Sequence, residues 1–250
     1  MTSSATNEAQ RPHVVFVHGF MDNADGWSGL IDRLQKAGYP STACDLRGAG
    51  RKQASEGPFT LEQGCTDIRA VIEEVGGDVV LVGHSMGAQI AELAATAHPE
   101  RVAALILITP TPLGGRTMPD AVRDGLRNAG GDVGAQRAIR QAFSTNLSDQ
   151  KLETLTDPAL IMGKAAVEGY YDAFTGGHEL GKEPVQYKGP TLLVGTLDDP
   201  VISSDLIREM RAERFPSATV RFIEDSGHWP QMEQSGACAA VILEQLSSLG

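Results

Sequence analysis

A serine stands at the centre of a short glycine-rich stretch, residues 83–87 (Gly-His-Ser-Met-Gly), which directly follows the apolar run of residues 79–82. A strand that turns at once into a helix leaves no room for side chains beside the turn, so glycines are required there and the central residue is strained. Residues 86–98 carry small and apolar side chains at helical spacing and are followed by a proline. The pattern predicts a strand, a sharp turn and a helix that together hold the hydroxyl of Ser85 outward.

A serine hydroxyl is a weak nucleophile at neutral pH and needs a base and an orienting carboxylate. The candidate base is His228, in a loop that follows the last predicted strand, where Gly227 gives the loop freedom to turn back. The candidate acids are Asp198 and Asp199, after the preceding predicted strand. The register of this loop leaves two alternatives. The number of residues from the end of the strand, at Gly195, favours Asp198. The numbers from its start, at Pro190, and from the following Pro-Val-Ile run favour Asp199.

The elements that must position these residues alternate short apolar runs with longer amphipathic segments, a pattern typical of a parallel sheet covered by helices on both faces. Strands are predicted at residues 14–17, 41–45, 79–82, 102–109, 191–195 and 220–223. Helices are predicted at residues 27–37, 60–75, 86–98, 204–214 and 238–249, with Thr60 and Gln63 as a capping box.

The interval between the fourth and fifth predicted strands is far longer than the loop of about 2–6 residues usual in such folds. Its apolar residues recur at helical spacing, which predicts an inserted helical cap at residues 110–189. The remaining residues, 12–109 and 190–250, form the predicted core, and the polar residues 1–11 are expected to be a disordered tail.

Four motifs together resemble those of the α/β-hydrolase fold family. They are the oxyanion-loop motif at residues 17–20 (Val-His-Gly-Phe), the Asp-x-Arg-Gly motif at 45–48, the nucleophile elbow at 83–87 and the histidine loop at 227–230. The resemblance covers residues 14–249 apart from the cap. It implies a mostly parallel sheet flanked by helices, but no sequence here corresponds to the family's usual first two strands, so we expect a trimmed, wholly parallel sheet.

The resemblance also assigns roles. Ser85 is the nucleophile and His228 the base, and Asp199 is preferred as the acid because in the family a proline or a short apolar turn commonly follows it. The backbone N–H groups of Phe20 and Met86 are the expected oxyanion donors. Trp27 and Trp229 flank the motifs and are candidates for the substrate pocket, although Trp27 is equally consistent with core packing.

Charge and composition limit the binding partners and the cellular location that we expect for the protein. A formal net charge of −11 argues against a nucleic acid, because such binding depends on clustered Lys and Arg. The three cysteines are widely spaced, so we expect neither a disulfide framework nor a zinc site, and a reduced, cytoplasmic setting. We also expect no other metal and no cofactor. Neither a signal peptide nor a run long enough to span a membrane is recognised. The partner is expected to be a small-molecule substrate, and the sequence does not determine the oligomeric state.

Serine at the elbow predicts acyl transfer, since relatives that open epoxides or displace halide carry an aspartate there. The preferred interpretation is a serine hydrolase that cleaves a carboxylic ester or lactone of a small, largely apolar substrate through an acyl-enzyme. The alternatives are a thioesterase, a hydrolase of carbon–carbon bonds in diketones with the same triad, and a ligand receptor of the same fold with little turnover.

Overall fold

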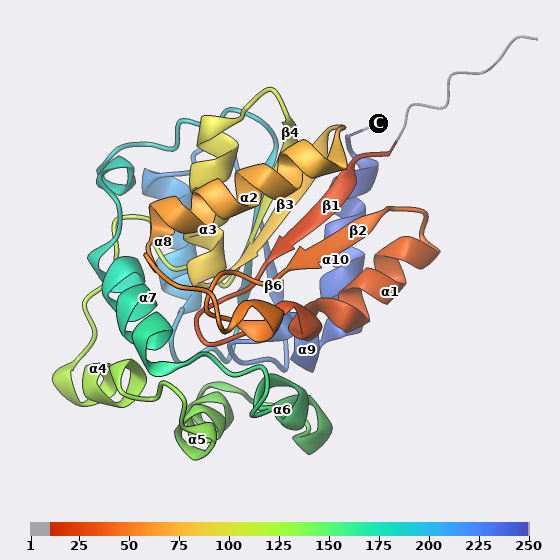
Figure 1. The fold of residues 1–250 in the computed structure, drawn as a ribbon. Helices are drawn as coiled ribbons and strands as arrows, with labels where there is room; N and C mark the ends of the chain where they lie inside the picture. The colour runs from red at the N-terminus through yellow and green to blue at the C-terminus, as the bar shows by residue number, and fades with distance from the viewer. Residues whose placement is uncertain (1–10, 250) are drawn as a thin grey trace, which may run out of the picture.

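The computed structural model describes residues 11–249, which form a six-stranded sheet in the order β2-β1-β3-β4-β5-β6 (Figure 1). All five neighbouring strand pairs are parallel, so the expectation of a wholly parallel sheet is confirmed. The strands are β1 (His13–Val17), β2 (Ser41–Cys44), β3 (Val79–His84), β4 (Val102–Ile108), β5 (Thr191–Thr196) and β6 (Thr219–Ile223).

Helices cover both faces of the sheet because side chains along each strand alternate between the two faces. In β1, Val15 and Val17 pack in one apolar core with residues of α2 (Leu61–Val75), α3 (Met86–Ala97) and α8 (Ser204–Glu213). Val14 and Phe16 pack on the other face in a second core, with residues of α1 (Ser28–Lys36) and α10 (Ser235–Ser247). The four inner strands, β1, β3, β4 and β5, are therefore buried on both sides, as near-continuous apolar runs predict.

Local sequence signals define where α2 begins and ends, although one predicted capping contact is absent. The Thr60 side chain accepts a hydrogen bond from the Gln63 backbone N–H at 3.2 Å, as the capping box predicts. The Gln63 side chain does not return to Thr60; it donates to Asp67 at 3.0 Å. The helix ends at Gly76, whose φ of 77° few other residues adopt without strain.

Residues 109–190 connect β4 to β5 and are mainly helical. They contain α4 (Asp120–Arg127), α5 (Val133–Phe143), α6 (Asp149–Leu155), α7 (Lys164–Gly176) and the short 3₁₀ helix η3 (Glu179–Lys182). Figure 1 shows α4, α5 and α6 beyond the end of the sheet to which the strand arrows point. This helical segment, residues 110–189, is called the cap below. Further short helices η1 (Ala24–Trp27), η2 (Gly50–Lys52) and α9 (Pro230–Glu233) lie in loops of the core.

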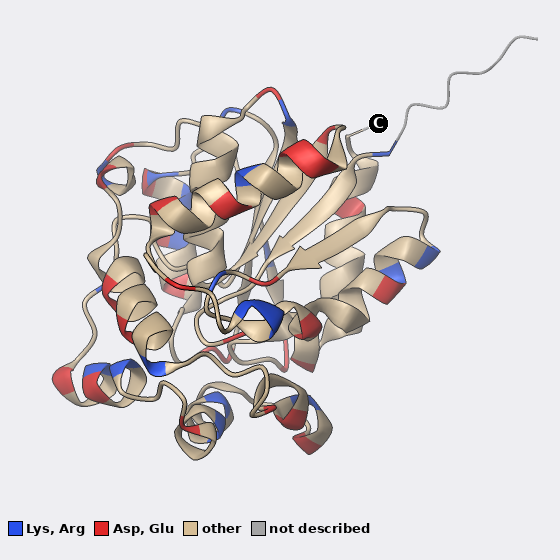
Figure 2. Ribbon diagram, viewed as in Figure 1, with Lys and Arg blue, Asp and Glu red and all other residues tan. Residues whose placement is uncertain are grey.

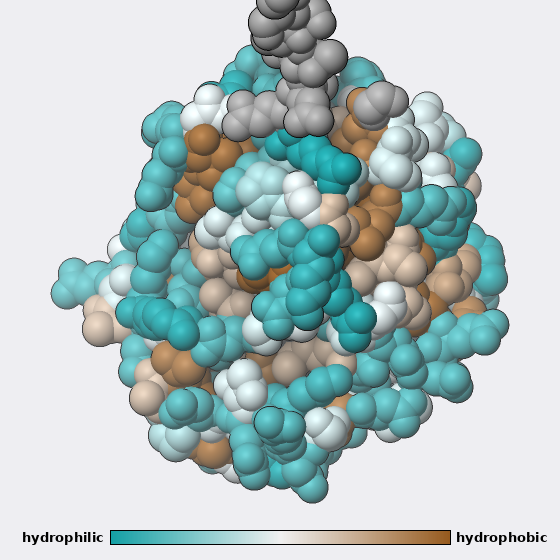
Figure 3. Space-filling view, turned by 90° about the vertical axis from the view of Figure 1, so that its right-hand side faces the viewer, coloured by the Kyte–Doolittle hydropathy of each residue, from teal (hydrophilic) through white to brown (hydrophobic). Residues whose placement is uncertain are grey.

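The outer surface carries charges of both signs in close alternation (Figure 2). On α4, for instance, Arg123 pairs with Asp120 and Asp124, and Arg127 pairs with Asp172 of α7. Figure 3 views the molecule from the side of α1 and β2, and hydrophilic side chains dominate this face. Their prevalence fits the burial of the apolar residues of α1, such as Leu30 and Leu34, in the core.

The expected tail, residues 1–11, lies outside the described residues except for Arg11. This residue departs from the expectation: its guanidinium lies over the ring of Tyr39, 4.7 Å from the centroid, and donates to the carbonyl of Ala37. A search of residues 11–249 found no helix with the length and apolarity needed to span a membrane.

The start of α3 lies unusually close to β1. An added Cβ at Gly87 would lie 2.3 Å from the carbonyl oxygen of Val17 and 2.4 Å from that of His18, both backbone atoms that cannot turn away. We expect Gly87→Ala to destabilise the protein by about 1–3 kcal/mol, as overpacking does. Chemical denaturation measures this change.

Gly125→Ala is the matched control, because Gly125 is an exposed residue of α4 with no atom within 4 Å of the added Cβ. Helix propensity alone should make that variant more stable by about 0.5–1 kcal/mol. Equal stability of the two variants would contradict this account of the elbow.

Candidate active site

Ser85 occupies the turn between β3 and α3, with φ of 51° and ψ of −118°. Non-glycine residues avoid positive φ, and holding one there costs about 1–3 kcal/mol. Among residues 11–249, the other non-glycine residues with positive φ are Met21, Thr109 and Asp225. Met21 lines the cavity with Ser85, Thr109 donates to the carbonyl of His228, and Asp225 lies three residues before His228. Backbone strain therefore recurs in the segments that carry the site.

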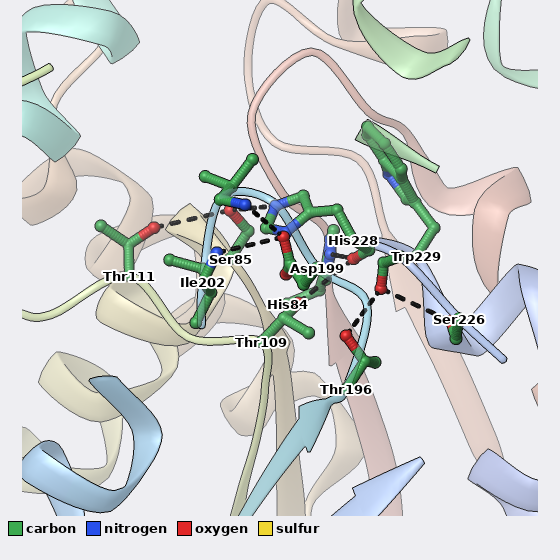
Figure 4. Close-up of polar contacts among 12 residues, drawn as sticks. His84, Ser85, Thr109, Thr111, Thr196, Asp199, Ile202, Ser226, His228 and Trp229 are labelled. Atoms are coloured by element: carbon green, nitrogen blue, oxygen red, sulfur yellow. Dashed lines mark hydrogen bonds and ion pairs between the residues drawn. The ribbon is translucent and has the colours of Figure 1, made fainter. Parts of the chain in front are cut away.

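Three side chains from three strand ends meet in one hydrogen-bonded chain (Figure 4). The Oγ of Ser85 lies 3.0 Å from Nε2 of His228, and Nδ1 of His228 lies 2.7 Å from Oδ2 of Asp199. The second carboxylate oxygen, Oδ1, accepts the backbone N–H groups of Val201 and Ile202 at 2.7 and 3.0 Å. The alternative acid, Asp198, is exposed, whereas Asp199 is 7% exposed.

For both His228 and Asp199, the combined effect of charge and hydrogen bonding on the pKa exceeds the effect of burial. Burial by itself would lower the pKa of His228, but the charge and hydrogen bond of Asp199, with smaller effects of Asp22 and Glu233, raise that pKa above its ordinary value of 6.5. Burial would raise the pKa of Asp199, but His228 and the two backbone N–H groups lower it below its ordinary value. The pair thus favours a carboxylate that stabilises an imidazolium.

The backbone around His228 is held from the sheet side. Its carbonyl oxygen accepts hydrogen bonds from Nε2 of His84 at 2.8 Å and from Oγ1 of Thr109 at 3.2 Å. The preceding carbonyl, that of Gly227, accepts from Oγ1 of Thr196 at 3.0 Å (Figure 4). These donors lie at or just beyond the ends of β3, β4 and β5. The strand ends therefore fix the position of the histidine loop relative to the sheet.

Glu233, in α9, holds the same loop from the other side. One carboxylate oxygen accepts the backbone N–H groups of Thr145, Asn146 and Gly227 at 2.7, 2.8 and 3.0 Å, and the other accepts that of Trp229 at 3.0 Å. Two of these donors belong to the cap and two flank His228. Sequence reasoning missed this residue, although an acidic side chain shortly after the histidine loop was a signal for it.

The oxyanion-loop motif packs directly against the elbow. A Cβ on Gly19 would lie 2.7 Å from Nδ1 of His84 and 3.2 Å from Cβ of Ser85. His18 braces the loop from below: its Nε2 accepts the N–H of Leu46 at 3.0 Å, and its Nδ1 therefore donates to the carbonyl of Gly19 at 2.8 Å. Burial lowers the pKa of His18, which keeps the ring neutral as both hydrogen bonds require.

The two expected oxyanion donors lie in the segments that meet at this point. Phe20 follows Gly19 and Met86 follows the serine, as the first residue of α3. None of the hydrogen bonds formed among residues 11–249 uses the backbone N–H of either residue. Both N–H groups therefore have no hydrogen-bond partner among the described residues.

Ser85 and His228 open into an apolar cavity between the core and the cap. The volume of this cavity is about 50 Å³. Residues of both parts line it: Phe20, Met21, His84, Thr111, Met118, Leu126, Ile139, Phe143, Phe174, Val201 and Trp229. Thr111, which the sequence did not single out, places Oγ1 3.5 Å from Oγ of Ser85.

The two tryptophans differ in position. Trp229 lines the cavity, as expected. The expectation that Trp27 also lines it is wrong: this side chain is 1% exposed and packs on Phe16, with ring centroids 4.8 Å apart, in the core beneath α1 and α10. Trp27 lies in η1, whose turn directs the ring onto the sheet. Among residues 11–249, no three His, Cys, Asp or Glu side chains are grouped so that they could hold a metal ion.

Comparison with known proteins identifies the family. Residues 12–235 match the alpha/beta hydrolase fold family, and the chain belongs to it. The dihydrolipoyllysine-residue acetyltransferase component of the acetoin cleaving system of Cupriavidus necator is 28% identical over 247 residues, covering 93% of this chain but only 63% of that relative.

Two further relatives are an sn-1-specific diacylglycerol lipase and an esterase. The lipase, from Danio rerio, is 26% identical over 238 residues, covering 86% of this chain and 72% of its own length. The solved structure of a thermophilic esterase from Thermogutta terrifontis superposes with a TM-score of 0.77 at 23% identity, covering 95% of this chain and 90% of that one. That superposition demonstrates the shared fold.

The contact between Asp199 and His228 gives a pKa prediction. Asp199→Asn keeps an oxygen for the N–H groups of Val201 and Ile202 but removes the charge that faces the imidazole. We expect the pKa of His228 to lie above 6.5 in the parent protein and to fall below 6.5 in the variant, where burial outweighs the smaller effects of Asp22 and Glu233. Imidazole titration by NMR measures both values. A pKa that does not fall in the variant would contradict the assignment of Asp199.

Glu233 gives a stability prediction. In Glu233→Gln an NH₂ group replaces one carboxylate oxygen, so a donor faces at least one backbone N–H, which is also a donor. We expect this to lower the free energy of unfolding by about 2–3 kcal/mol. For a chain of this size that corresponds to a melting temperature roughly 4–12 °C lower. Glu244→Gln is the control, because Glu244 is exposed and pairs only with Arg221 at the surface. Equal melting temperatures for the two variants would contradict the role of Glu233.

Proposed function

We propose that the protein is a serine hydrolase that cleaves small carboxylic esters through an acyl-enzyme intermediate. One observation carries this proposal: Ser85, His228 and Asp199 form a hydrogen-bonded chain that opens into an apolar cavity beneath the cap. Membership of the alpha/beta hydrolase fold family and the names of an esterase and a lipase among the relatives support it.

The proposed reaction follows from the order of the three side chains. Oγ of Ser85 attacks the ester carbonyl carbon while Nε2 of His228 takes its proton, and Asp199 stabilises the imidazolium that forms. The carbonyl oxygen becomes an oxyanion that the N–H groups of Phe20 and Met86 bind. Nε2 then returns the proton to the departing alkoxide oxygen. A water molecule, activated by the same imidazole, releases the acid and restores the serine.

The lining of the cavity supports an uncharged ester or lactone over a diketone that carries a carboxylate. Recognition of a carboxylate uses Arg or Lys, with guanidinium groups preferred for paired hydrogen bonds. Of the described residues that line the cavity, none is Lys or Arg, and the polar ones are Ser85, Thr111, His84 and His228. The wall therefore favours an apolar acyl group next to the reacting carbonyl.

The size of the cavity indicates a short acyl group. A cavity of about 50 Å³ has room for a few groups of the size of a water molecule, since one water needs at least about 10–15 Å³. A two- to four-carbon acyl group has a similar number of atoms. Longer chains would need the large side chains Met118, Phe143 and Phe174 to move apart.

The test of this proposal is turnover of aryl esters of graded acyl length. We expect hydrolysis to fall at least tenfold in kcat/KM between butyrate and octanoate, since the longer chain does not fit without displacing packed side chains. Ser85→Ala should lose turnover by a factor on the order of 10³ or more, because no nucleophile remains. Turnover of the parent and of Ser85→Ala is measured by release of the aryl alcohol.

A fluorophosphonate separates the enzyme from a receptor of the same fold. Wild-type protein should be labelled covalently at Ser85, and Ser85→Ala should not be labelled. A wild-type protein that neither hydrolyses any ester nor reacts with the fluorophosphonate would exclude the proposed function and favour a receptor.

A further inference from the structure

The carboxylate of Asp22 lies behind the hydrogen-bonded chain, where the segments of the site meet. Asp22 is 4% exposed and follows the oxyanion-loop motif by two residues. Its Oδ2 accepts the indole N–H of Trp229 at 2.9 Å and lies 3.4 Å from Nδ1 of His84. Trp229 is next to His228 in the sequence, and His84 is next to Ser85. This one carboxylate therefore contacts the neighbours of both reacting side chains.

The positive charge that faces Asp22 comes from the cap. Arg140 lies in α5, is 1% exposed, and places Nη2 3.5 Å from Oδ1 of Asp22. The same guanidinium donates to the carbonyl oxygens of Gln136, at 2.9 Å, and of Met21 in the oxyanion loop. A charge buried this deeply is costly unless another charge and hydrogen bonds compensate it. The pair therefore favours one arrangement, in which α5 is docked on the oxyanion loop.

The end of α5 contacts the histidine loop as well. The carbonyl of Phe143, the last residue of this helix, accepts the backbone N–H of His228 at 2.9 Å. An added Cβ on Gly227 would lie 2.5 Å from that same carbonyl oxygen. Helix α5 thus contacts the oxyanion loop through Arg140 and the histidine loop through Phe143.

We propose that Asp22 and Arg140 are positioning residues, and that their charge pair couples the docking of cap helix α5 to the alignment of the nucleophile, the base and the oxyanion loop. This proposal rests on the proposed function for its kinetic consequences. The cap is then part of the catalytic framework along α5, in addition to being a cover over the substrate.

The charge state of Asp22 supports the coupling. Burial would raise the pKa of Asp22, but the nearby imidazole of His84, the charge of Arg140 and the hydrogen bond from Trp229 lower it to about 2. The group is therefore a carboxylate throughout the pH range of an esterase assay. Loss of Arg140 leaves this buried anion without its cationic partner, which favours a rearrangement of the loop that carries it.

The experiment is a double-mutant cycle in the full chain: Asp22→Asn, Arg140→Met and the double variant, assayed with a short aryl ester. Displacement of reacting groups by about 1 Å can cost up to 10²-fold, so we expect each single variant to lose roughly 10- to 100-fold in kcat with less than about threefold change in KM. The double variant should lose less than the product of the two single losses, because neither charge is left alone. Arg140→Lys keeps the charge and should recover at least tenfold of the loss.

Arg127→Met is the matched control, because Arg127 is a cap arginine that pairs with Asp172 at the surface. Its kcat should stay within about twofold of the parent, as expected for an exposed pair. Circular dichroism and thermal melts check that every variant is folded. An active parent with an unchanged kcat in Arg140→Met, or purely additive losses in the cycle, would overturn the inference.

An NMR readout keeps the inference testable without turnover. The chain has two tryptophans, so the indole N–H signals of Trp27 and Trp229 can be assigned by substitution. In Arg140→Met we expect the Trp229 signal to shift and that of Trp27 to stay, because only Trp229 donates to Asp22. An inactive parent would contradict the proposed function, whereas an unmoved Trp229 signal would contradict the coupling.

Discussion

The buried imidazole of His228 is the group on which the rest of the site depends. A ring that must bond a hydroxyl on one side and a carboxylate on the other tolerates little movement, because hydrogen bonds weaken steeply with distance and angle. Ser85 and Asp199 provide these two partners. The backbone of His228 is fixed just as firmly, since its carbonyl accepts from two side chains of the sheet and its N–H donates to the cap.

Two buried carboxylates behind the cavity connect the core to the cap. Asp22 and Glu233 are both less than a tenth exposed, and neither belongs to the hydrogen-bonded chain that faces the cavity. Glu233 is compensated by four backbone N–H groups, and Asp22 by Trp229, His84 and Arg140. In both cases part of the compensation comes from the cap. The core and the cap therefore depend on each other for stability, since separating them would expose or strand these groups.

The hydrogen-bonded chain at Ser85 and the apolar wall of the cavity come largely from different parts of the molecule. The reactive groups follow strands of the sheet, whose ends a parallel arrangement brings to one edge. Most of the apolar wall around them comes from the cap, through residues such as Leu126, Ile139 and Phe174. Relatives of this fold carry names as different as acetyltransferase component and diacylglycerol lipase. That diversity fits a fold that hosts different functions, each set by the residues of the site.

The sequence by itself determined the parallel sheet, the elbow at Ser85 and the loops that carry Phe20, His228 and the candidate acids. It could do so because glycine spacing and apolar periodicity are local signals. Tertiary structure alone decided which tryptophan lines the cavity, since Trp27 and Trp229 both flank motifs and differ only in the direction that their turns impose. It also placed Asp199, which the family resemblance preferred over Asp198, against His228. The pairing of Arg140 with Asp22 had no local signal, because it joins residues far apart in the chain whose burial depends on how the cap docks.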